Sequence, residues 1–116
     1  MTKKPETTIK SYSELFTREE DDLVYDDENT QNPFTGVIED FHAKFQLYSR
    51  GNYKDGKKDG LWEGFWDNGQ LEWRGYLKDG KEDGMWEGFD ENGQIEFTSY
   101  YINGKKVKRK KYLKSK

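Results

Sequence analysis

Large apolar residues, glycines and charged residues alternate along this chain in a pattern that repeats every 24 residues. Residues 51–74 read GNYKDGKKDGLWEGFWDNGQLEWR, and residues 75–98 read GYLKDGKEDGMWEGFDENGQIEFT. Weaker copies extend the repeat to about residues 34–106, with Gly36 in the position of Gly60. A repeat of this length is one supersecondary unit, which buries its apolar face by stacking on its neighbours.

Two kinds of turn punctuate each repeat and predict a series of β-hairpins. Asn68-Gly69 and Asn92-Gly93 lie between strand-like runs, which predicts two-residue type I′ turns. Asp-Gly or Asn-Gly pairs at 55–56, 79–80 and 103–104 then join one hairpin to the next, again as even-length loops. The predicted pairs are Trp66 with Leu71, Phe65 with Glu72, Gly64 with Trp73, Glu63 with Arg74, Trp62 with Gly75, Leu61 with Tyr76, Gly88 with Phe97, Trp86 with Ser99, Ile38 with Gly51 and Glu39 with Arg50.

This register divides the apolar residues between two faces of a sheet. The predicted folding face carries the glycines with Trp62, Trp66, Leu71, Trp73, Leu77, Trp86, Ile95, Phe97 and Tyr101. The opposite face carries Leu61, Phe65, Tyr76, Met85, Phe89, Tyr100 and Ile102, interleaved with Glu63, Glu72, Arg74, Glu87 and Glu96. The expected fold is all-β: an elongated, twisted antiparallel β-meander of repeated hairpins that forms a single-layer sheet.

Composition limits the function classes. Charged residues make up 37% of the 116 residues and would suggest disorder, but the 16% aromatic content favours a folded domain. The chain has no cysteine, which excludes disulfides and thiol chemistry. No apolar run approaches membrane-spanning length and no signal peptide opens the chain, so we expect a cytoplasmic protein.

The net charge of -3 is distributed unevenly. Residues 105–116 contain eight of the 20 Lys and Arg and no acid, which leaves 12 basic and 23 acidic residues, a net charge of -11, in the rest. An acidic body repels nucleic acid and favours basic partners. The basic end could bind nucleic acid or an anionic membrane, or could be a solvated terminus or a charged last strand that resists aggregation. We divide the chain into an acidic segment (1–22), a repeat domain (23–106) and a basic tail (107–116).

No group of residues predicts catalysis. His42 is the only histidine and lacks a Ser or Cys partner pattern, and the aspartates near glycines do not match a calcium-binding loop. The Gly-rich turns precede no helix, so they form no phosphate cradle. We expect a non-enzyme with no cofactor and no metal.

The pattern D-G-K-x-D-G-x-W-E-G-F-x-x-N-G-Q-[LI]-E resembles the MORN repeat in its bacterial form. The lead-in Leu23-Val24-Tyr25, with Asn32-Pro33-Phe34-Thr35-Gly36, is similar to the start of YwqK-type antitoxins. The resemblance implies an antitoxin or immunity protein that binds and neutralises a toxin. Related MORN proteins imply an alternative, a scaffold that binds anionic membrane, here through residues 105–116. Lys44-Phe45 departs from the pattern, because its copies have Asn-Gly.

The candidate partner-binding surface is the face opposite the tryptophans, because large aromatics among charges are typical of protein interfaces. A basic toxin that attacks nucleic acid would be steered to an acidic inhibitor. Residues 1–33 could instead fold back over this face, and Phe45 is either tucked under that segment or exposed as a contact. The candidate residues are Phe45, Glu63, Phe65, Glu72, Arg74, Tyr76, Glu87, Phe89, Glu96 and Tyr100.

Overall fold

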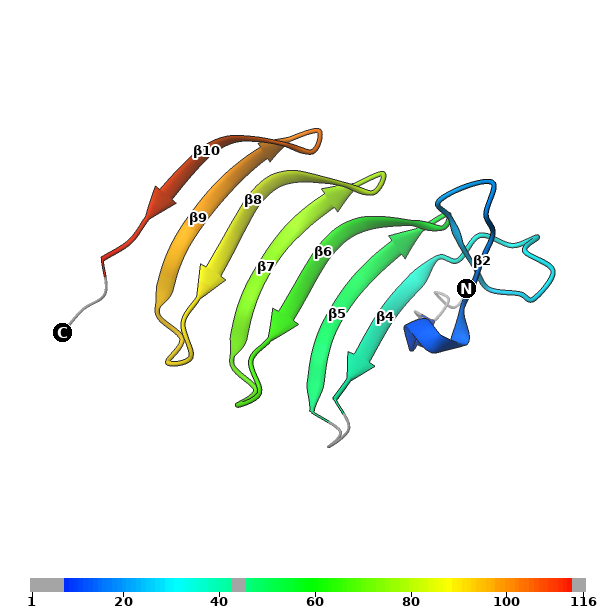
Figure 1. Cartoon of the computed structure of the whole chain (residues 1–116), viewed down its shortest axis with the longest axis horizontal. Helices are drawn as coiled ribbons and strands as arrows, with labels where there is room; N and C mark the ends of the chain where they lie inside the picture. Colours follow the sequence, from blue (N-terminus) through cyan, green and yellow to red (C-terminus); the bar gives the residue numbers. More distant parts are fainter. Residues whose placement is uncertain (1–7, 43–45, 114–116) are drawn as a thin grey trace, which may run out of the picture.

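The computed structural model describes residues 8–42 and 46–113, and over these residues the protein is all-β (Figure 1). An eight-stranded sheet has the order β1-β4-β5-β6-β7-β8-β9-β10, and a two-stranded sheet pairs β2 with β3. Every pair in the large sheet is antiparallel except β1 with β4. This confirms the predicted meander of hairpins. The elements are β1 (Ile9–Lys10), the 3-10 helix η1 (Tyr12–Glu14), β2 (Phe16–Thr17), β3 (Val24–Tyr25), β4 (Gly36–Phe41), β5 (Leu47–Lys54), β6 (Lys57–Phe65), β7 (Leu71–Lys78), β8 (Lys81–Phe89), β9 (Ile95–Ile102) and β10 (Lys105–Lys111).

The predicted register is confirmed along the body of each hairpin and is wrong beside the Asn-Gly turns. Gly64 faces Trp73 and Trp62 faces Gly75, as predicted, and the corresponding pairs of β8 with β9 and β4 with β5 also match. The turn itself spans three residues, because the Trp66 N–H donates to the Gln70 carbonyl and the Gly69 N–H donates to the Trp66 carbonyl. Only the glycine of this turn has a positive φ, so it is not the predicted type I′ turn.

A β-bulge restores the register after each of these three-residue turns. Phe65 therefore pairs with Leu71 rather than with Glu72, and Phe89 pairs with Ile95. Because opposite residues share a face, Leu71 and Ile95 lie on the face of the phenylalanines, which corrects their predicted placement with the tryptophans. Glu72 is the extra residue of its bulge, and it lines a hollow together with Trp62 and Trp73.

The Asp-Gly turns are the type I′ turns, and they join successive units. Asp55 and Asp79 have φ of 50°, and the glycine after each is also left-handed. The glycine N–H of each turn donates to a carbonyl of the preceding unit at an interval of 24 residues: Gly56 to Phe34 (2.8 Å), Gly80 to Lys58 (2.8 Å) and Gly104 to Glu82 (2.7 Å). The same bond at every joint makes each unit a template for the next.

One face of the sheet, here called the tryptophan face, is built from rings that lie on glycines. A Cβ at Gly51 would lie 2.0 Å from Cδ2 of Trp62, and a Cβ at Gly75 would lie 2.0 Å from Cδ2 of Trp86. The indole N–H of Trp62 donates to the Asn52 carbonyl at 2.8 Å, which fixes the ring across the neighbouring strand. Glycine is required at these positions because any side chain would occupy the space of a ring.

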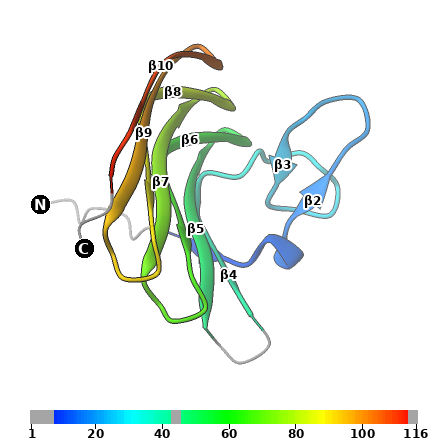
Figure 2. The same cartoon turned by 60° about the vertical axis from the view of Figure 1, so that its left-hand side comes forward.

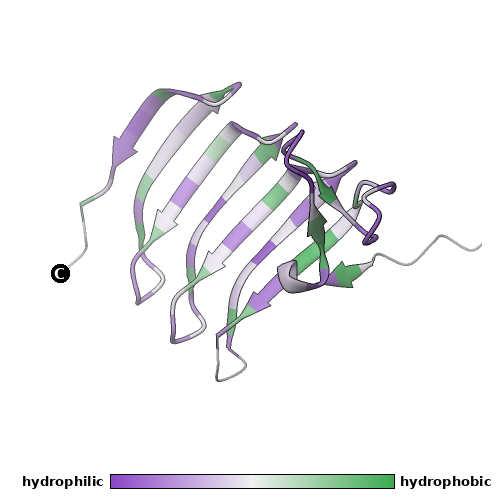
Figure 3. Ribbon diagram, turned by 45° about the vertical axis from the view of Figure 1, so that its right-hand side comes forward, coloured by the Kyte–Doolittle hydropathy of each residue, from purple (hydrophilic) through white to green (hydrophobic). Residues whose placement is uncertain are grey.

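The described N-terminal residues 8–34, here called the cap, pack on the tryptophan face at the β4–β6 end. Val24 and Phe34 form the buried core with Ile38, Tyr53 and Trp62, and Leu15 packs against them. The Val24 N–H donates to the Gly56 carbonyl at 3.0 Å, which attaches β3 to the first Asp-Gly turn. Figure 2 shows the upper strand ends bending toward the side of the cap, and Figure 3 shows the cap in front of one end of the sheet. The sheet is thus a single layer only beyond the cap.

Candidate protein-binding surface

The face opposite the tryptophans, here called the outer face, carries large apolar side chains that are exposed. Leu61 pairs with Tyr76 and Met85 pairs with Tyr100, so these residues form two cross-strand pairs on one face. Tyr76 is 51% exposed and Tyr100 is 44% exposed. Exposed tyrosines supply large contact areas at low conformational cost, so these residues are candidates for contact with a partner.

A row of alternating charges crosses the outer face. Five strands from β4 to β8 place Glu39, Arg50, Glu63, Arg74 and Glu87 side by side in direct register. Arg74 Nε donates to Glu87 Oε1 at 2.9 Å, and Arg50 Nε lies 3.7 Å from Glu39 Oε2. The hydrogen bond that Arg74 donates to Glu87 and the charges of Glu87 and Glu63 raise the pKa of Arg74. The row therefore holds its side chains in a fixed pattern, and its charges nearly balance.

The two phenylalanines of the predicted surface lie at the lower end of the outer face and are half-buried. The Arg74 guanidinium lies 5.8 Å from the centre of the Phe89 ring, which places Phe89 beside the charged row. Phe65 occupies the same position one unit earlier. These two rings, with Tyr76 and Tyr100, form an aromatic border on both sides of the charges.

The structure therefore brings together most of the predicted site residues, while two others lie in bulges and one lies outside the described residues. Phe65, Tyr76, Phe89 and Tyr100 share the outer face with Glu63, Arg74 and Glu87. Glu72 is the extra residue of a bulge and lines hollows that Phe65 also lines. Glu96 holds the same bulge position and lines a hollow with Trp66. Phe45 lies outside the described residues.

The cap leaves the outer face uncovered, which corrects the alternative that the N-terminal segment folds over it. Its apolar residues Leu15, Val24 and Phe34 are directed at the tryptophan face instead. The tryptophan face is therefore the folding face, as predicted, and is covered at one end. Farther along it, Trp73 and Trp86 stack with ring centroids 5.6 Å apart, and Tyr101 meets Trp86 edge-on.

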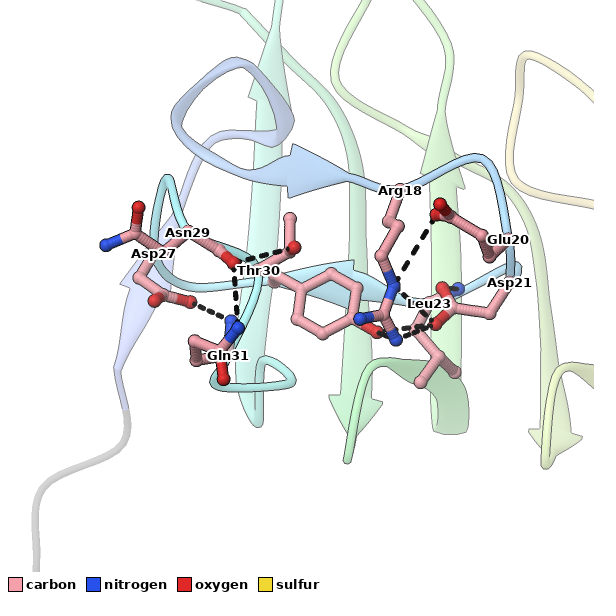
Figure 4. A network of polar contacts seen from close by, with 9 residues as sticks. Arg18, Glu20, Asp21, Leu23, Asp27, Asn29, Thr30 and Gln31 are labelled. Atoms are coloured by element: carbon pink, nitrogen blue, oxygen red, sulfur yellow. Dashed lines mark hydrogen bonds and ion pairs between the residues drawn. The ribbon is translucent and has the colours of Figure 1, made fainter.

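A polar network holds the cap together, and the sequence reasoning did not find it (Figure 4). Arg18 and the Tyr25 hydroxyl both donate to Asp21 Oδ2, and the Leu23 N–H donates to Asp21 Oδ1 at 3.0 Å. The hydrogen bonds from Tyr25 and Arg18 lower the pKa of Asp21 to about 2. The signal was present in the sequence, because Arg18 is the one cation in the acidic stretch from Ser13 to Glu28.

His42 contacts an aromatic ring and a carboxylate at the lower end of the sheet. Its ring centroid lies 4.9 Å from that of Tyr48 in an edge-on arrangement, and its Nε2 lies 3.3 Å from Asp67 Oδ1. Among residues 8–42 and 46–113, no group of three or more His, Cys, Asp or Glu side chains is placed to hold a metal ion.

No protein-family model and no curated protein matches this chain. Within the described part of the chain, no helix is long and apolar enough to cross a membrane.

Proposed function

We propose that this chain is a non-catalytic binding protein whose partner is a toxin domain that it neutralises, as an antitoxin or immunity protein. One observation carries the binding function: the outer face presents Tyr76, Met85 and Tyr100 in the open, although the chain has a cap that covers apolar residues on the other face. An exposed aromatic surface on a sheet that already has its core indicates a partner outside the chain.

The toxin as partner rests on the resemblance to the MORN repeat and to YwqK-type antitoxins, and on charge. The outer face itself is nearly neutral, so its charged row would set the orientation of a partner rather than attract it over distance. The attraction comes from the acidic body, and above all from the cap, which holds eight acidic and two basic residues. A basic domain that binds nucleic acid would be steered toward such a body, and neutralisation requires only that it be held with its active site covered.

The experiment begins with capture of partners from the native host at low salt, followed by binding measurements on the purified pair. Tyr76→Ala and Tyr100→Ala should each weaken the binding by about 10- to 1,000-fold, as expected for tyrosines that contribute about 1–4 kcal/mol to an interface. Tyr12→Ala is the matched control, because Tyr12 is 50% exposed and lies in the cap, beside Tyr53 of the tryptophan face. Co-expression of the partner with each variant then tests neutralisation through cell growth.

Two outcomes would contradict the proposal. If Tyr12→Ala weakens the binding as much as Tyr76→Ala does, the outer face is not the interface. If the captured partner is harmless when it is expressed alone, the chain is a binding protein but not an antitoxin.

A further inference from the structure

β10 is the open edge of the sheet and carries an unusual concentration of positive charge. In the described part of the chain it pairs with β9 alone, so one row of its backbone N–H and C=O groups faces away from the sheet. Six of its seven residues are Lys or Arg, none is acidic, and all seven are exposed. Strand edges of this kind are templates for an added strand.

The repeat pattern ends at this strand. Thr35, Asp59 and Asp83 recur every 24 residues, and each side chain accepts a hydrogen bond from the backbone N–H that opens the turn of the next unit. The next residue in this series is Val107, which has no acceptor to offer. Lys108 likewise stands where Gly60 has a φ of 99°. A further unit of the same kind therefore does not fit on the edge.

The positive charges extend over both faces of the strand. Arg109 pairs with Ser99 and its guanidinium lies 4.7 Å from the centre of the Phe97 ring on the tryptophan face. Lys108 pairs with Tyr100 of the outer face. Lysines on an edge usually prevent pairing with another copy of the same strand. The same charges attract a strand that carries carboxylates on both faces.

At the opposite end of the sheet the edge strand is the two-residue β1, which comes from the chain's own N-terminal segment. β1 pairs with β4 through Ile9 with Val37 and Lys10 with Ile38. Farther along β4, the Asp40 carboxylate accepts hydrogen bonds from the Ser11 hydroxyl and the Tyr12 N–H, each at 3.1 Å. The chain thus covers one edge with its own N-terminal residues and leaves the basic edge exposed.

We propose that the open edge of β10 binds an extended acidic segment of a partner protein, which adds as a ninth strand of the large sheet. The backbone of the segment bonds to the outward row of β10, and its carboxylates meet Lys and Arg on both faces. This site is an edge of the sheet rather than one of its faces, and it does not depend on the proposed function.

The test uses a labelled heptapeptide, Glu-Glu-Val-Glu-Glu-Val-Glu, and the full chain at low salt, with fluorescence anisotropy as the measurement. The peptide should bind, and its affinity should fall with added salt. Two N-methylated versions, one at the odd and one at the even residues, keep every charge but remove the N–H groups of one edge each. An added strand pairs through one of its two edges. The version that is methylated on that edge should therefore bind at least about tenfold more weakly than the unmodified peptide, because several backbone hydrogen bonds are blocked.

Protein variants locate the site. Arg109→Glu with Lys110→Glu should weaken peptide binding about tenfold or more, because attraction becomes repulsion at two positions. Lys54→Glu with Lys78→Glu makes the same change in net charge on exposed residues of β5 and β7, and should alter the affinity less than about twofold. Circular dichroism checks that both pairs of variants keep the fold.

Three results would overturn the proposal. Equal binding of the peptide and both N-methylated versions would show attraction by charge without strand addition. Tighter binding of an oligothymidylate or of phosphatidylserine vesicles than of the peptide would assign the edge to phosphates. Self-association of the chain that the peptide cannot compete away would assign the edge to a second copy.

Discussion

The rings that lie on glycines make a sharp prediction about two substitutions with the same chemistry. Gly51→Ala and Gly75→Ala would each place a Cβ 2.0 Å from Cδ2 of the opposite indole. Ordinary contact between carbons requires about 3.5–4.0 Å, so either ring must withdraw by about 1.5 Å or more. The two sites differ in what lies above the ring, and this difference decides the cost.

At Gly51 the ring is packed under the cap and has less room to withdraw. Trp62 is only 8% exposed and packs against Tyr53 and the cap residues Val24 and Phe34. Overpacking costs about 1–3 kcal/mol, and loss of the indole hydrogen bond to the Asn52 carbonyl costs about 1 kcal/mol. Replacing glycine with alanine also stabilises the folded protein by about 0.5–1 kcal/mol, because alanine restricts the conformations of the unfolded chain. We expect Gly51→Ala to destabilise the protein by about 1–3.5 kcal/mol.

At Gly75 the ring can swing outward, because Trp86 lies beyond the cap and is half-buried. This movement would break the hydrogen bond from the Trp86 indole N–H to the Tyr76 carbonyl (3.0 Å) and part of the stacking of Trp86 on Trp73. The lower conformational entropy of alanine in the unfolded chain offsets part of this loss of stability. We expect a net loss of about 1 kcal/mol. In a Trp86→Ala background the added methyl group meets no ring, so Gly75→Ala should be neutral or stabilising by up to about 0.5–1 kcal/mol.

Urea denaturation followed by far-UV circular dichroism measures these differences, and the double-mutant cycle isolates the contact between glycine and ring. Equal costs for Gly51→Ala and Gly75→Ala would refute the effect of the cap. No coupling between positions 75 and 86 would refute the close approach itself.

Three further substitutions test the cap, the lower turns and the bends. Asp21 has a folded pKa of about 2, below its ordinary value, so its stabilising effect is complete above pH 4 and is lost as the pH falls toward 2. Hydrogen exchange of the Val24 N–H should become faster over the same pH range, and Asp21→Asn should abolish this pH dependence. Trp66→Phe removes the indole hydrogen bond to the Phe89 carbonyl (3.1 Å) and should cost about 1 kcal/mol in urea denaturation. Gly84 has a φ of 97° with no heavy atom within 4 Å of a Cβ, so Gly84→Ala should cost about 1–2 kcal/mol through backbone strain alone, and a neutral result would contradict this.

The sequence predicts the sheet well because each hairpin is specified locally and repeats. The register of pairs such as Glu63 with Arg74 depends only on how the length of the turn and the bulge beside it combine. A three-residue turn followed by one bulged residue gives these pairs the same register as a two-residue turn without a bulge. The turn type was wrong because Asn68 does not adopt a left-handed conformation. Its side chain instead accepts the Gln70 N–H at 2.8 Å, and Gly69 alone takes the positive φ.

The residues of the candidate surface could be predicted from the sequence wherever side chains alternate regularly between the two faces of the sheet. Tyr76 pairs in regular register with Leu61, and Tyr100 with Met85, so their face follows from counting along those hairpins. Glu72 and Glu96 lie in bulges, where alternation fails. The position of the cap did not follow from the repeat, because the packing of Val24 on Tyr53 and Trp62 is a tertiary contact between segments with no common pattern.

The hydrogen bonds that recur every 24 residues make the number of units an adjustable property of this fold. Each Asp-Gly turn presents the same donor to the unit before it, and the middle joint, formed by Gly80 and Lys58, repeats the bond of the joints on either side of it. A duplicated segment such as 51–74 inserted before Gly75 would meet its own bonding partners on both sides. Duplication of one unit would then lengthen the outer face by one aromatic pair and one charged pair while both ends stay unchanged, so this architecture can change the length of its binding surface through gene duplication without redesign of its core.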